Sequence, residues 1–99
     1  SNGLGVSVQD IKAIKWYRLA AMQGVPAAQS NLGIIYGTGK GVAINVTQAY
    51  IWWSMATKQG DSDAANNLEI LKSRISRLQI AKNKALATKC FESSYQKCD

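Results

Sequence analysis

Apolar residues recur along the chain at intervals of three and four, the spacing that places side chains on one face of an α-helix. The first such stretch carries a stripe that is predicted to be buried, made of Ala13, Trp16, Tyr17, Ala20 and Gly24. The next stretch carries an inner stripe of Ala28, Leu32 and Ile35. The pattern therefore predicts two successive antiparallel helices, in which alanines allow close approach and aromatic residues supply the buried area.

Residues that begin and end helices mark the boundaries of these stretches. Gly24 and Gly60 stand where a helix would end with a left-handed residue. Pro26 stands at the first position of the next helix, where its missing N–H is harmless. Asn45 and Gln48 have the spacing of a helix cap. The glycine-rich segment 37–41 is predicted to be a flexible connector between one helix pair and the next.

The chain repeats itself with a period of 36 residues. When it is shifted by that distance, 12 of the 33 residue pairs from 3/39 to 35/71 are identical. Trp16 falls on Trp52, and Tyr17 lies opposite Trp53, so the aromatic positions keep their register. The other identical pairs are Gly3/Gly39, Gly5/Gly41, Val6/Val42, Ala13/Ala49, Ala20/Ala56, Gln23/Gln59, Gly24/Gly60, Ala28/Ala64, Asn31/Asn67, Leu32/Leu68 and Ile34/Ile70. Such a period is typical of stacked helix pairs.

A segment of different character follows the second unit. Ser76 and Gln79 have the spacing of a capping box and predict a last helix that runs to about Thr88 or Cys90. Apolar residues lie on two sides of it, with Ile80, Leu86, Ala87, Cys90 and Phe91 on one side and Leu78, Ala81 and Ala85 on the other. A helix of this kind is either sandwiched between other elements or part of an oligomer contact.

These residues together resemble the Sel-one-like repeat (SLR) family, a relative of the tetratricopeptide repeats. The matching pattern is Ala13-x-x-Trp16-Tyr17-x-x-Ala20-Ala21-x-Gln23-Gly24, then Ala28-Gln29-x-x-Leu32-Gly33-x-x-Tyr36-x-x-Gly39-x-Gly41-Val42. The second copy follows it through Ala49, Trp52, Ala56, Gln59, Gly60, Ala64 and Leu68, and departs from it at Trp53, Thr57, Glu69 and Lys72. The resemblance implies an all-α superhelix, or solenoid, of two SLR/TPR-like helix pairs plus a C-terminal capping helix.

The expected organisation has four parts. Residues 1–8 are the end of a preceding repeat or a connector, 9–44 the first repeat, 45–74 the second repeat, and 75–99 the C-terminal capping helix with a cysteine clamp. The segment Gly3-Leu4-Gly5-Val6 looks like the close of an earlier repeat, which favours a piece of a longer array. A short natural protein with two repeats explains the sequence equally well.

Positions that differ between the two copies indicate a binding surface. One helical stripe does not repeat, and we expect a protein or peptide partner to bind it on a concave helical face. The stripe comprises Lys12, Lys15, Leu19, Met22, Gln48, Ile51, Met55 and Lys58. Ile51 and Met55 would form its apolar centre, because methionine suits a surface that adapts to its partner. The alternative is that the stripe packs against further repeats or a second chain, as in a homodimer.

Charge offers a different function. The chain has 99 residues, of which 46% are hydrophobic, and a net charge of +6. Residues 72–99 contribute +5 of that charge. The alternative function is therefore the binding of an anionic surface or acidic partner through the basic C-terminal helix, by Lys82, Lys84 and Lys89. A solvated helix face would have the same composition, and no nucleic acid is expected as a partner.

The sequence predicts no catalysis, no cofactor and no metal site. It contains no histidine, and its six acidic residues are scattered, with Asp61 and Asp63 placed as helix-start residues. Two sulfurs without histidine are too few ligands for zinc. The connector at 37–41 lacks the Lys-Ser/Thr ending of a phosphate-binding loop, and no apolar run approaches the roughly 20 residues of a membrane helix.

Two cysteines, Cys90 and Cys98, bear on the location of the protein. Eight residues of straight helix rise about 12 Å, whereas a disulfide needs Cα atoms within about 7 Å. A bond would therefore require the helix to end and the chain to turn back, for which Ser93-Ser94 is suited. Such a clamp suits an oxidising compartment, and the resemblance to exported bacterial members implies a periplasmic or secreted protein. Two free thiols in a cytosolic protein are the alternative. Ser1-Asn2 looks like the scar of a tag, so a signal peptide would already be absent.

The disulfide can be tested by the redox state of the two thiols. The protein is equilibrated across glutathione buffers, the thiols are trapped and the intact mass is read. A structural bridge is expected to show a reduction potential below about −300 mV. Two thiols that stay free in mildly oxidising buffer would contradict the clamp.

Overall fold

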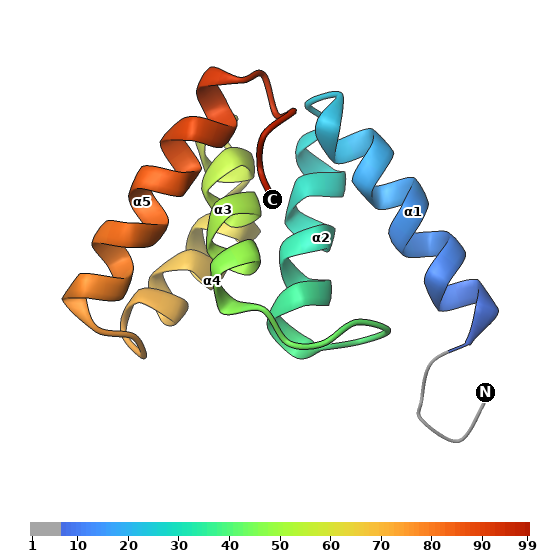
Figure 1. The fold of residues 1–99 in the computed structure, drawn as a ribbon, viewed down its shortest axis with the longest axis horizontal. Coiled ribbons are helices and arrows are strands. Elements are labelled where there is room, and N and C mark those ends of the chain that lie inside the picture. The colour runs from blue at the N-terminus through green and yellow to red at the C-terminus, as the bar shows by residue number, and fades with distance from the viewer. Residues whose placement is uncertain (1–6) are drawn as a thin grey trace.

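The computed structural model describes residues 7–99, which form five helices (Figure 1). They are α1 (Val8–Met22), α2 (Pro26–Thr38), α3 (Val46–Lys58), α4 (Ser62–Lys72) and α5 (Arg77–Glu92). Figure 1 shows them side by side in an arch that has α1 at one end and α5 at the other. The expectation of an all-α solenoid of two helix pairs plus a last helix is confirmed. The expected close of an earlier repeat at residues 3–6 lies outside the described residues.

The helix boundaries follow from local capping. Four helices begin with a side chain that accepts a hydrogen bond from the backbone N–H three residues on: Ser7, Asn45, Asp61 and Ser76. These bonds satisfy donors that the first turn of a helix otherwise leaves free. α2 begins at Pro26. Gly24 follows the end of α1 with φ 89°, and Gly60 follows the end of α3 with φ 92°.

The connector after α2 begins two residues later than expected. Gly37 and Thr38 belong to the helix, because α2 continues to Thr38 and ends at Gly39 with φ 75°. Gly41 also has positive φ, at 84°. Positive φ thus requires glycine at Gly39 and Gly41, where the chain reverses, and not along the whole segment 37–41.

α3 lies at the centre of the fold, since α2, α4 and α5 all pack on it. Most of its residues are buried, and Trp52 is 1% exposed. The contact with α2 is close because α2 presents Gly33 to Trp53. A Cβ atom at Gly33 would come within 2.4 Å of the Trp53 ring, and one at Gly37 within 3.1 Å. The Trp53 Nε1 also donates a hydrogen bond to the Ser30 carbonyl at 3.2 Å.

The buried amide of Gln29 connects three helices across this contact. The Gln29 Nε2 donates to the Ala21 carbonyl at 3.1 Å, and the Gln59 Nε2 donates to the Gln29 Oε1 at 2.9 Å. Gln29 is fully buried. Because a buried polar group is costly unless it is hydrogen-bonded, these pairs fix the ends of α1 and α3 relative to α2.

The prediction that Trp16 is buried is wrong. Trp16 is 72% exposed, and Ala13 is also exposed, whereas Trp52 at the equivalent position is 1% exposed. The difference comes from the neighbours of each helix. α3 is surrounded by three helices, while α1 packs chiefly on α2. The same sequence pattern therefore produces a core residue in one copy and a surface residue in the other.

Two hollows one period apart also show that α1 has fewer neighbouring helices than α3. One, of about 270 Å³, lies between α1 and α2, and the other, of about 160 Å³, lies between α3 and α4. They share equivalent lining residues, Asn31 and Ile34 in the first and Asn67 and Ile70 in the second. The second is also lined by Gly37 of the preceding helix. The first has no counterpart of that helix within residues 7–99, so this side of α1 stays open.

Replacing Gly33 by alanine tests the contact between α2 and α3. The new methyl group would overlap the Trp53 ring, and overpacking of this kind costs about 1–3 kcal/mol, which exceeds the gain of about 1 kcal/mol in helix propensity. Because a Cβ only 2.4 Å from the ring puts this overlap at the upper end of that range, we expect Gly33→Ala to lower the free energy of unfolding in urea by about 2 kcal/mol. Gly37→Ala is the matched control and should change it little. Equal stability of the two variants would contradict the contact.

Candidate interaction surface

The tail segment (residues 93–99) folds back against the helices. α5 ends at Glu92, and Ser94 and Tyr95 adopt φ of 56° and 70°, which reverses the chain where the Ser93-Ser94 turn is expected. Cys90 and Cys98 form a disulfide with their Cα atoms 4.3 Å apart. The predicted disulfide is therefore present, and it closes the tail segment onto the end of α5.

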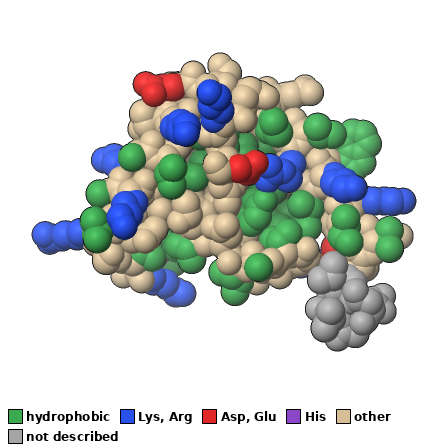
Figure 2. Space-filling model, viewed as in Figure 1, with side chains coloured by type: hydrophobic (Ala, Val, Ile, Leu, Met, Phe, Trp, Pro, Cys, Tyr) green, Lys and Arg blue, Asp and Glu red, His purple; other side chains and the backbone are tan. Residues whose placement is uncertain are grey.

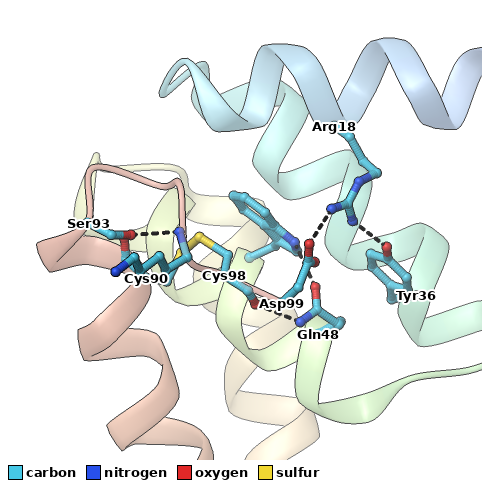
Figure 3. A network of polar contacts seen from close by, with 9 residues as sticks. Arg18, Tyr36, Gln48, Cys90, Ser93, Cys98 and Asp99 are labelled. Atoms are coloured by element: carbon cyan, nitrogen blue, oxygen red, sulfur yellow. Dashed lines mark hydrogen bonds and ion pairs between the residues drawn. A yellow bond between two sulfur atoms is a disulfide. The ribbon is translucent and has the colours of Figure 1, made fainter.

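Hydrogen bonds join the tail segment to α1 and α3 (Figure 3). The Gln48 Nε2 donates to the Cys98 carbonyl at 2.7 Å, and the Trp52 Nε1 donates to the Gln48 Oε1 at 3.2 Å. At the other side, the Gln96 Nε2 donates to the Met22 carbonyl at 2.9 Å. The tail segment is thus hydrogen-bonded to α3 through Cys98 and to α1 through Gln96.

Arg18 of α1 holds the carboxylate of the tail segment. One guanidinium nitrogen donates to the Asp99 Oδ2 at 2.7 Å, and the other donates to the Tyr36 hydroxyl at 2.7 Å. Figure 3 shows Arg18 pointing from α1 toward both groups. Burial lowers the pKa of Arg18, but the hydrogen bond to Asp99 and the phenol of Tyr36 outweigh it and hold the pKa above its usual value. The guanidinium is thus a charged, oriented donor.

The first-copy half of the predicted binding stripe lies on the surface of α1. Lys12, Lys15 and Leu19 are exposed, and Met22 is half-buried. A hollow of about 310 Å³ is lined by Lys15, Leu19 and Met22 together with Arg18. This half of the stripe is therefore accessible to a partner.

The second-copy half does not form such a surface. Ile51 and Met55 are 1% and 0% exposed and belong to the core with Cys90 and Cys98, and Gln48 is 8% exposed. The expectation that Ile51 and Met55 form an accessible apolar centre is wrong, because α5 and the tail segment cover this side of α3. Substituting either residue by glutamate would test folding and not partner binding.

Lys58 is the one member of the second-copy half that reaches the surface. Its ammonium lies over the ring of Phe91 on α5, 4.9 Å from the ring centroid. This cation–π contact ties α3 to the end of α5. Lys58 is therefore separated from the lysines of α1 and does not extend the exposed stripe.

Sequence patterns place Trp16 in the core and assign no role to Arg18 or Tyr36. Arg18 follows Lys15 by three residues, which marks it as part of the same basic row. No local signal connects it to Asp99, because the two residues are 81 positions apart. The pairing depends on the path of the tail segment.

Within residues 7–99, no three His, Cys, Asp or Glu side chains gather as ligands for a metal ion. None of the five described helices has the length and hydropathy needed to cross a bilayer. The arrangement on α1 is suited to non-covalent recognition, since it combines a fixed guanidinium, lysines and exposed apolar side chains.

A known family profile matches the chain. The profile of the Sel1 repeat matches residues 1–25 and 26–61, which is more than half of the chain. The second match takes in α2 and α3, so the profile divides the chain between α1 and α2. The parts expected at 9–44 and 45–74 instead pair α1 with α2 and α3 with α4, and they stay predictions. No curated protein matches the chain.

Removing the disulfide tests its role in holding the tail segment. We expect Cys90→Ala/Cys98→Ala to lower the free energy of unfolding by about 2–3 kcal/mol, because the released loop gains freedom in the unfolded state. The backbone amides of Gln96 and Lys97, which donate to the Ser93 hydroxyl, should exchange faster with deuterium. Asp99→Asn is the control and should cost at most about 1 kcal/mol, since the ion pair is exposed. Unchanged exchange in the double variant would contradict this role.

Proposed function

Because the chain belongs to the Sel1 repeat family, whose repeats are generally protein–protein interaction modules, we propose that it is a non-catalytic scaffold that binds a partner on α1. The binding surface comprises the exposed side of α1: Lys12, Lys15, Trp16, Leu19 and Met22. Four of these residues come from the predicted stripe, and Trp16 is added because of its exposure. The second-copy residues Gln48, Ile51, Met55 and Lys58 are not part of this surface.

The exposure of Trp16 is the observation that carries this proposal. Trp16 is 72% exposed and Leu19 is 55% exposed, whereas the equivalent residues Trp52 and Met55 are covered by protein. Large apolar side chains on a rigid helix bury much area at a small cost in conformational entropy, and tryptophan is enriched among residues that dominate binding. Figure 2 shows hydrophobic and basic side chains next to one another over α1, on the right of the view.

A second function is favoured by a hollow beside α5. It has a volume of about 220 Å³ and is lined by Lys58, Lys72 and Lys84 together with Tyr50. Burial, and to a smaller extent Glu69, raises the pKa of Tyr50, so its phenol stays protonated and can donate a hydrogen bond. This arrangement supports binding of an anionic ligand near the basic C-terminal helix. It involves α3, α4 and α5 and is separate from the surface on α1.

The disulfide supports a location outside the cytosol. Because a structural Cys90–Cys98 bridge persists in an oxidising compartment, we propose that the protein is periplasmic or secreted. A second copy of the chain or a further repeat would also fit against α1. The mass of a protein crosslinked to α1 distinguishes these occupants from a different partner protein.

Site-specific crosslinking tests the surface on α1. A photoreactive amino acid is placed at position 16, at position 62 on α4 or at position 86 on α5, and adducts formed in the native host are identified by mass. We expect a discrete protein adduct from position 16, which Leu19→Glu suppresses and Leu78→Glu does not. Both leucines are exposed, so neither change should alter stability by more than about 0.5 kcal/mol. Adducts from position 86 alone would contradict the proposal and favour the function at α5.

A further inference from the structure

We infer that the segment bound by α1 is acidic and extended, and that α1 holds it as it holds the tail segment of its own chain. This inference rests on the proposed function, because it names the chemistry of the partner on that surface. Its basis is the pairing of Arg18 with Asp99, the basic row that continues from Arg18, and the hollow beside them.

The tail segment serves as an internal example of the bound chain. Asp99 places its Oδ2 2.7 Å from the guanidinium of Arg18, and Tyr36 holds that guanidinium from its other nitrogen at 2.7 Å. One residue earlier, the carbonyl of Cys98 accepts from Gln48. A carboxylate and a neighbouring backbone carbonyl are thus recognised by side chains of different helices, which is how an extended chain is held at intervals along its length.

The basic row continues along α1 beyond the position of Asp99. Lys15 and Lys12 precede Arg18 by three and six residues, so successive positions are about 4.5 Å apart along the helix axis. Neither lysine takes part in the ion pairs found among residues 7–99. In an extended chain, alternate side chains lie about 7 Å apart on one side. These two spacings differ, but a lysine ammonium stands on a flexible four-carbon stem, so the ammonium groups of Lys15 and Lys12 can spread to pair with two such carboxylates.

The hollow gives a place for an apolar side chain between these charges. Its volume is about 310 Å³, and Leu19 and Met22 line it beside Lys15 and Arg18. The aliphatic stems of lysine and arginine add to its apolar wall. An acidic segment that carries an aliphatic residue therefore matches both the charge and the shape of the surface.

Charge also decides against a second copy as the occupant. The chain has a net charge of +6, and a basic face is poorly matched to another copy of a basic protein. The exposed carboxylate of Asp99 is already paired with Arg18 of the same chain. The occupant that we infer is an acidic segment of another protein.

Fluorescence anisotropy with a defined probe tests the inference. The probe is a fluorescein-labelled peptide, Asp-Leu-Glu-Ser-Asp-Leu-Glu-Ser-Asp-Tyr, and its control has asparagine and glutamine in place of the acids. We expect the acidic peptide to bind at least ten-fold more tightly than the control at low salt. Lys12→Gln/Lys15→Gln should remove most of that difference and reduce the salt dependence. Lys82→Gln/Lys89→Gln removes the same charge from α5 and should change affinity less than two-fold.

Freeing Arg18 gives a test in the opposite direction. Asp99→Asn removes the carboxylate that competes for Arg18, so this variant should bind the acidic peptide about two- to five-fold more tightly. Glu92→Gln makes the same change in net charge on α5 and should leave the affinity unchanged. A general effect of charge would raise the affinity of both variants equally, which would overturn the inference.

The remaining outcomes separate this inference from the proposed function. Equal affinity for the acidic and neutral peptides, with binding lost in Leu19→Glu, would overturn the acidic partner but keep α1 as the binding surface. Absence of binding by either peptide at millimolar concentration would also overturn the inference, and the crosslinking at position 16 would still decide the proposed function. Loss of binding in Lys82→Gln/Lys89→Gln would assign the acidic ligand to α5.

Discussion

The contact of Trp53 with Gly33 is the constraint on which the rest of the structure depends. A side chain at position 33 would collide with the indole, so the absence of a Cβ atom allows α3 to approach α2 closely. The indole N–H of Trp53 donates a hydrogen bond to the carbonyl of Ser30, which lies on α2 together with Gly33. With α3 fixed in this way, α4 and α5 pack on its remaining sides. The fold is therefore organised around one central helix and not around a sequence of equal pairs.

This central position makes two equivalent helices unequal. α1 and α3 carry the same repeated residues, but α3 is covered by protein and α1 has one helix as its main neighbour. The exposed side of α1 carries large apolar side chains, including Trp16, and the residues beside them are lysines. An exposed apolar and basic surface thus arises from the same pattern that forms the core one period later.

The tail segment connects the ends of the fold. The disulfide holds it to α5, Gln48 holds it to α3, and Arg18 holds it to α1, so one short segment touches three helices. This path explains why Ile51 and Met55 are buried in the core. It also places a carboxylate on α1, and that contact is the internal example from which an acidic partner is inferred.

The sequence by itself determined the features that depend on neighbours along the chain. Helix caps at Asn45, Asp61 and Ser76 act over three residues, and Gly24 and Gly60 end helices where the repeat places them, so local rules and the period of 36 residues were sufficient. Tertiary structure alone decided exposure. A periodic stripe identifies which residues can be buried, but burial requires a second element against that face. Trp16 and Trp52 share one pattern and differ because α3 has neighbours that α1 lacks among the described residues.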